Sequence, residues 1–71
     1  MRYAIVIEKA DSNYGAYVPD LPGCVSTGET IDEVKQNIAE AVEFHIQGLI
    51  EDGEPVPPPT SLSDYVEAKV A

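Results

Sequence analysis

The feature that most restricts the fold of this sequence is a long amphipathic segment with a helix signal at each end. Thr30 and Glu33 match a capping box, in which the threonine hydroxyl accepts from the Glu33 amide and the glutamate reaches back to the Thr30 amide. Apolar residues then recur at helical spacing: Ile31, Val34, Ile38, Val42, His45 or Ile46, and Leu49. Gly53 stands where a left-handed C-terminal cap is expected. The pattern predicts a helix over 31–52, about 33 Å long, whose end should project beyond a small sheet or meet another chain.

The residues before this helix predict an antiparallel sheet. Residues 2–9 are rich in β-branched and aromatic side chains and form the first predicted strand. Polar turn residues at 11–13 lead into a second strand at 14–18, so the two make a hairpin. Pro19 ends the second strand because it cannot donate to a ladder. A Pro-Gly turn then leads to a short third strand at 24–27.

The residues after the helix predict an extended segment and a final strand. Residues 53–60 contain four prolines and cannot continue the helix; they favour a polyproline conformation running back along the molecule. The segment serves either as a rigid tether or as a ligand for an SH3-type domain. Residues 65–70 alternate, with Val66, Ala68 and Val70 on one side, which predicts a strand at a sheet edge. The expected fold over residues 1–71 is a single α+β domain of order β-β-β-α-β, its antiparallel sheet packed on one long helix.

The size and composition of the chain favour self-association. A chain of 71 residues has a thin core, and small domains are often stabilised by disulfides, a metal or a partner. One cysteine and one histidine supply neither an internal disulfide nor a convincing metal set. We therefore expect a homo-oligomer, with Val66, Ala68 and Val70 as the candidate contact edge. The lone cysteine and the lack of a signal-peptide or membrane-span pattern indicate a cytoplasmic location.

The charge of the chain argues against direct nucleic-acid binding. The formal net charge is −9, and the four basic residues are dispersed, whereas phosphate binding needs clustered Lys and Arg. Between positions 29 and 54 there are eight acidic residues and one basic residue. The bland interpretation is a solvated helix face. The alternative is a basic partner, for which Glu33, Glu40 and Glu43 are the candidate contacts.

Catalytic interpretations of the sequence are weak. A residual nuclease would need Asp11, Asp20 or Glu43 to hold a divalent metal in a partly buried cleft. His45 lies on or beside the apolar stripe of the helix and is more simply a packed or boundary residue. Cys24 lacks an evident base and orienting group. We therefore expect no enzymatic activity and no cofactor.

The loop before the third strand carries the most specific motif. The run from Tyr14 to Thr30, Tyr-Gly-Ala-Tyr-Val-Pro-Asp-Leu-Pro-Gly-Cys-Val-Ser-Thr-Gly-Glu-Thr, resembles the signature of the HicB-type antitoxin family. Positions 37–41 and the exit at 53–57 are similar to the family pattern as well. The motif loop consists of Tyr17, Pro19, Asp20, Leu21, Pro22, Gly23 and Cys24. The resemblance covers roughly residues 3 to 60.

This resemblance implies a partial ribonuclease H-like domain without the nuclease active site. It also implies that the chain is the inhibitory half of a toxin–antitoxin pair, whose partner is a small basic mRNA-cleaving toxin of the HicA type. Many members carry a C-terminal DNA-binding domain, for which 71 residues leave no room, so the expected chain is a short member without direct operator binding. The second hypothesis is an orphan self-assembling binding domain with no toxin partner.

Overall fold

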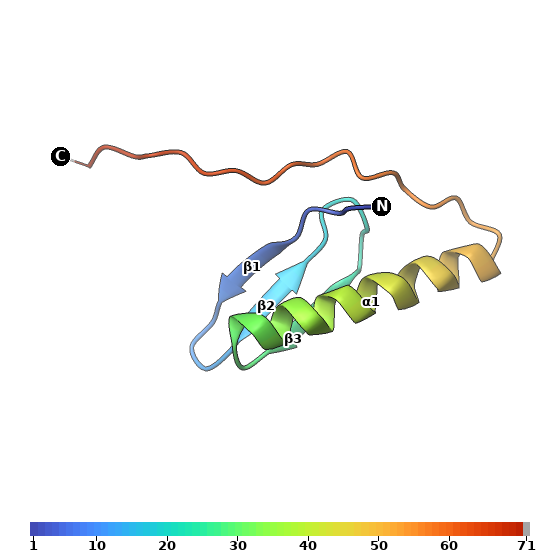
Figure 1. The fold of residues 1–71 in the computed structure, drawn as a ribbon, viewed down its shortest axis with the longest axis horizontal. Coiled ribbons are helices and arrows are strands. Elements are labelled where there is room, and N and C mark those ends of the chain that lie inside the picture. Colours follow the sequence, from blue (N-terminus) through green and yellow to red (C-terminus); the bar gives the residue numbers. More distant parts are fainter. Residues whose placement is uncertain (71) are drawn as a thin grey trace.

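The computed structural model describes residues 1–70, and Figure 1 shows a small sheet, one long helix and an extended C-terminal segment. The elements in chain order are β1 (Val6–Lys9), β2 (Tyr14–Tyr17), β3 (Val25–Gly28) and α1 (Ile31–Glu51). The predicted order β-β-β-α and the class α+β are confirmed.

The three strands form an antiparallel sheet in the order β1-β2-β3. The register places Ile7 opposite Ala16 on the face that packs against α1. Strand β1 is shorter than the predicted strand over 2–9. The reason lies in its partner: β2 ends at Tyr17, just before Pro19, so the residues preceding Val6 have no strand opposite them.

The predicted helix and both of its caps are confirmed. The Glu33 amide donates to the Thr30 hydroxyl at 3.0 Å. The Glu33 carboxylate accepts from the Glu29 amide at 3.0 Å, one residue earlier than the predicted Thr30 amide. At the other end, Gly53 has a φ of 69° and the Glu54 amide donates to the Leu49 carbonyl at 2.9 Å. This left-handed C-terminal cap ends the helix at the predicted glycine.

The core lies between the sheet and the first half of the helix. Its buried residues are Ala16, Val18, Leu21, Cys24, Val34 and Ile38. Gly28 permits the close approach of β3 and α1, because a Cβ at this position would lie 2.6 Å from the Val34 nitrogen. The second half of α1 extends past the strands (Figure 1), with Phe44 82% exposed. The predicted projection of the helix end is therefore confirmed.

The C-terminal segment runs back past the sheet, as its prolines predicted (Figure 1). Residues 65–70 are not assigned to the predicted final strand: no backbone–backbone hydrogen bond joins them to any other described residue. The alternation of Val66, Ala68 and Val70 makes the segment suitable for a strand, but a ladder needs a hydrogen-bonded neighbour. The radius of gyration is 14.1 Å, against about 11 Å for a compact chain of this length, so the molecule is markedly extended.

Candidate functional site

The motif loop between β2 and β3 is a compact turn built around a buried leucine. The Leu21 amide donates to the Val18 carbonyl at 3.1 Å, and the Cys24 amide donates to the Leu21 carbonyl at 3.0 Å. Gly23 adopts a φ of 84°, which favours glycine. Leu21 is fully buried. The loop is therefore fixed to the core. This holds Asp20, which precedes the buried leucine, in a defined position.

Asp20 connects this loop to the C-terminal segment. Its Oδ2 accepts from the amides of Thr60 and Ser61, each at 2.9 Å. Its Oδ1 accepts from the Thr60 hydroxyl at 3.1 Å and the Ser61 hydroxyl at 2.8 Å. The bonds from Ser61 and Thr60 lower the pKa of Asp20 below its ordinary value. The carboxylate thus acts as a fourfold acceptor that fixes the start of the last ten residues.

Cys24 lies in the core, and His45 lies at the boundary of the packed face of α1. Cys24 is a free, buried thiol in the core cluster. Burial raises the pKa of this thiol, which keeps it protonated. His45 is half-buried on α1, the boundary position that the apolar stripe predicted. A buried thiol with a raised pKa has little of the thiolate character of a reactive cysteine.

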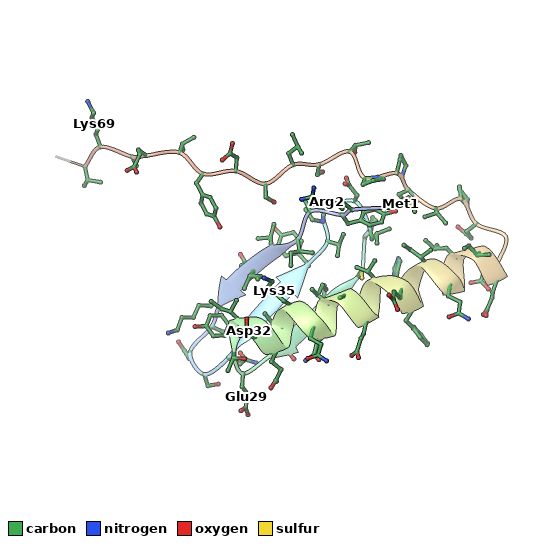
Figure 2. All side chains as sticks on the ribbon, viewed as in Figure 1. Met1, Arg2, Glu29, Asp32, Lys35 and Lys69 are labelled. Atoms are coloured by element: carbon green, nitrogen blue, oxygen red, sulfur yellow. The ribbon has the colours of Figure 1, made fainter. Side chains whose placement is uncertain are left out.

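The three candidate partner-facing acids lie exposed along α1. Glu33 also serves the N-terminal cap, whereas Glu40 and Glu43, three positions apart, share one helix face. Figure 2 shows Glu29 and Asp32 at the N-terminal end of the helix, where further negative charge gathers. The structure therefore places these acids on one continuous element, open to solvent.

An apolar groove lies beside Glu43, between the N-terminal residues and α1. Helix α1 packs mainly on β3 and β2 and leaves the β1 side of the inner face open. The groove is lined by Met1, Tyr3, Ile5, Lys35, Ile38, Ala39, Val42 and Glu43. Of the three candidate acids, Glu43 alone borders it. The combination of an apolar recess and an exposed acidic face is suited to contact with a protein surface.

The three carboxylates considered for a residual nuclease, Asp11, Asp20 and Glu43, lie on different elements. Within residues 1–70 there is no group of three or more His, Cys, Asp or Glu side chains that could hold a metal ion. Asp20, one of the three carboxylates considered for this role, accepts hydrogen bonds from Thr60 and Ser61.

Over residues 1–70, no helix combines the length and apolar composition needed to cross a membrane.

Comparison with known proteins decides the family. The family model described as "HicB_like antitoxin of bacterial toxin-antitoxin system" matches residues 3–70. The chain belongs to the HicB-like antitoxin family. The match includes the motif loop, the helix and the extended C-terminal segment, so the resemblance seen in the motif run extends over nearly the whole chain.

Several relatives are identical to this chain at more than 40% of the aligned residues. A 14.9 kDa protein from the rep-hol intergenic region of Haemophilus phage HP1 is 44% identical over 66 residues, which are 93% of this chain and 50% of that protein. The chain thus spans half the length of this relative. A UPF0150 protein of Synechocystis is 46% identical over 56 residues, covering 78% of this chain and 71% of the relative. A UPF0150 protein of Archaeoglobus fulgidus is 42% identical over 57 residues, with coverages of 76% and 83%.

A solved structure supports the fold and the family together. One chain of the structure titled "HicA3 and HicB3 toxin-antitoxin complex" matches with a TM-score of 0.74 and 37% sequence identity. The match covers 83% of this chain and 70% of that chain. The β-β-β-α arrangement is therefore shared with a component of a toxin–antitoxin assembly.

Sequence reasoning missed the role of Asp20 and the residues that contact it. Thr60 and Ser61 follow the proline-rich segment as an ordinary polar pair, and nothing local indicates an acceptor 40 positions earlier. The hydrogen bond from the Tyr3 hydroxyl to the Pro57 carbonyl was equally hidden. The one sequence signal for this contact was the pair of hydroxyl-bearing residues, Thr60 and Ser61, at the end of the proline-rich segment.

Proposed function

We propose that this chain is an antitoxin that neutralises a small basic ribonuclease of the HicA type by direct protein–protein contact. The observation that carries the proposal is the 37% identical match, over 83% of the chain, to a component of a HicA3–HicB3 toxin–antitoxin complex. Inhibition by occlusion requires a complementary surface and no chemistry of its own. This agrees with the unactivated Cys24 and with an Asp20 engaged in structural hydrogen bonds.

The acidic face of α1 is the proposed toxin-facing surface. Glu40 and Glu43 are exposed on one side of the helix, and Glu43 borders the apolar groove. An acidic surface of this kind accelerates encounter with a basic protein. The adjoining groove supplies apolar area that can be buried once the encounter complex has formed. The charge of this face would then set the rate of association, and the burial of the groove would set the lifetime of the complex.

The finer description of the fold belongs to this proposal. We infer a partial ribonuclease H-like domain in which residues 65–70 supply a further strand once they find a hydrogen-bonded neighbour. The extended backbone of these residues supports that inference. A cytoplasmic site of action follows from the proposed target, an mRNA-cleaving toxin.

The test combines binding with inhibition. The purified chain is mixed with a HicA-type toxin encoded in the same genome, complex formation is measured by gel filtration, and RNA cleavage is assayed. Stoichiometric loss of cleavage with co-elution is expected. Undiminished cleavage and separate elution would overturn the proposal.

The exposed C-terminal segment favours a second candidate function, an orphan self-assembling binding domain. Leu62, Tyr65, Val66 and Val70 are each more than 90% exposed, which suits association with any strand edge. A neighbouring reading frame for a small basic protein supports the antitoxin role, whereas its absence supports the orphan domain.

A further inference from the structure

The one basic residue of the acidic helix region borders the apolar groove. Between positions 29 and 54 the chain has eight acidic residues and a single base, Lys35. Lys35 is exposed on the first turns of α1 (Figure 2) and lines the groove together with Glu43. Asp32 is the only acidic residue three or four positions from Lys35, and it is not among the lining residues. A positive charge at the groove therefore interrupts a helix surface that is otherwise negative.

The groove carries opposite charges at its two ends along the helix. Lys35 and Glu43 are eight positions apart on α1, which is about 12 Å along the axis at ~1.5 Å per residue. Ile38 and Val42 line the groove between them. Its volume is about 340 Å³, at the lower end of the roughly 300–1,000 Å³ that is typical of ligand sites. An apolar recess with a charge of each sign distinguishes the orientation of an occupant as well as its composition.

The wall opposite the helix is held in place by the C-terminal segment. Met1, Tyr3 and Ile5 alternate along the chain and line the groove, as side chains on one side of an extended backbone do. The Tyr3 hydroxyl donates to the Pro57 carbonyl, and the Ser63 hydroxyl donates to the Ile5 carbonyl at 3.5 Å. The groove is therefore formed before a partner arrives, which lowers the cost of ordering it on binding.

We propose that the groove binds a segment of the basic toxin in one orientation, with an acidic residue of that segment against Lys35 and a basic residue against Glu43. The apolar side chains between these two residues would cover Ile38 and Val42. This inference rests on the proposed antitoxin function and specifies the kind of toxin segment that is bound. The two charges of the segment would be about 12 Å apart, which is two helical turns or about four residues of extended chain.

Lys35 is a specificity residue in this arrangement. A basic toxin is attracted by the acidic face of α1 as a whole. A toxin without an acidic residue at the groove would place a like charge or an unpaired group against Lys35, and either would disfavour that partner. The single base of the helix thus distinguishes one basic protein from another, which the surrounding acids cannot do.

Reversing Lys35 separates this inference from general attraction by the sign of the effect. Lys35→Glu makes the chain more acidic, so long-range attraction alone would give faster and tighter binding of a basic toxin. The groove contact gives the opposite result, because two acids would then face each other, and the dissociation constant should rise about tenfold or more. Lys9→Glu makes the same charge change on β1, outside the groove, and should not weaken binding. Lys35→Arg keeps the charge and should bind as the wild type does.

A charge swap on the toxin identifies the contact. Each Asp and Glu of the HicA-type toxin from the same genome is replaced by Lys in turn, with circular dichroism to check folding, and binding is measured by surface plasmon resonance. One variant should lose affinity for the wild-type chain and regain it with Lys35→Glu. If no folded variant restores binding, the pairing with Lys35 is refuted.

The outcomes distinguish this inference from the proposed function. A wild-type chain that does not bind the toxin would refute the proposed function and the partner named here together. A wild-type chain that binds, with Lys35→Glu binding equally well or more tightly, would overturn the groove contact alone. Sedimentation equilibrium of the chain without toxin should give one mass for the wild type and Lys35→Glu. A difference would assign the groove to a second copy of the chain and overturn the inference.

Discussion

Asp20 and Ser61 are 41 positions apart in the chain and joined by two hydrogen bonds, of 2.9 Å from the Ser61 amide and 2.8 Å from its hydroxyl. Thr60 adds two more to the same carboxylate. The relationship links the loop that carries the most specific sequence motif to the segment that lies outside the sheet. The aspartate of the motif thus fixes the C-terminal segment, a role that is separate from forming the turn.

Replacing this carboxylate should release Thr60 and Ser61 of the C-terminal segment. In Asp20→Asn, the amide nitrogen presents donors where one oxygen accepted them, so the bonds from Thr60 and Ser61 cannot all form. Hydrogen exchange at the Thr60 and Ser61 amides should accelerate about tenfold or more. Asp64→Asn is the matched control, because Asp64 accepts only from the adjacent Tyr65 amide. Equal exchange rates in the wild type and Asp20→Asn would contradict the anchoring role.

The same contact should have a defined pH dependence. Hydrogen bonds from Ser61 and Thr60 lower the pKa of Asp20 below its ordinary value of 3.8. A carboxyl with a lowered folded-state pKa stabilises the fold fully above its unfolded pKa and loses that contribution as the pH falls through the folded value. The amide chemical shifts of Thr60 and Ser61 should therefore titrate with a midpoint below 3.8. A midpoint above 3.8 would show that these bonds do not stabilise the charged form.

The sequence predicted those parts of the fold whose signals are local. The capping residues Thr30 and Glu33 and the terminating Gly53 define the helix because each acts on backbone groups within a few positions. The turn at Pro22–Gly23 is local for the same reason. By contrast, the start of β1 depends on where β2 ends, and the pairing of residues 65–70 depends on a hydrogen-bonded neighbour, which the described residues 1–70 do not place beside them. Local patterns indicate what a segment suits, and long-range partners decide what it does.

The candidate site divides in the same way. The acidic character of Glu33, Glu40 and Glu43 is visible in the sequence because charge and helical spacing are both local properties. The groove beside Glu43 is not, since it arises where α1 packs on β3 and β2 and leaves the β1 side open. The bonds between Asp20 and Ser61 required the tertiary path of the proline-rich segment. The motif loop was thus recognised by resemblance before its physical role was apparent.

Two glycines offer a matched test of the packing between β3 and α1. In Gly28→Ala, the new methyl group would lie 2.6 Å from the Val34 nitrogen, so the strand or the helix must shift. A loss of about 1–3 kcal/mol in the free energy of unfolding is expected. Gly48→Ala places its methyl group where no atom lies within 4 Å, inside the helix. It should stabilise the chain by ~0.5–1 kcal/mol through helix propensity. Urea unfolding followed by circular dichroism measures both, and a destabilised Gly48→Ala or an unaffected Gly28→Ala would be inconsistent with this packing.

Charge reversal on α1 should weaken toxin binding selectively. The double variant Glu40→Lys with Glu43→Lys reverses two exposed acids of α1, of which Glu43 borders the groove, and should slow association with a basic toxin by about tenfold or more at low salt. The control is Glu8→Lys with Asp11→Lys, which changes the net charge equally at the β1–β2 hairpin, outside α1. Surface plasmon resonance gives both rates. If the two double variants slow association to the same extent, net charge and not this helix face governs the encounter.

Ionic strength should separate the two proposed interactions of the chain by the sign of its effect. Two copies carrying −9 each repel one another, and salt screens that repulsion, with a Debye length that falls from about 30 Å at 0.01 M to about 8 Å at 0.15 M. Self-association through the exposed C-terminal segment, the second candidate function, should therefore strengthen as salt is added. Binding of a basic toxin relies on attraction and should weaken over the same range. Sedimentation equilibrium of the chain alone and binding kinetics with the toxin, both measured between these salt concentrations, provide the comparison. An assembly that dissociates on adding salt would point to an interface held by ion pairs, in contradiction to association through the exposed apolar residues Leu62, Val66 and Val70.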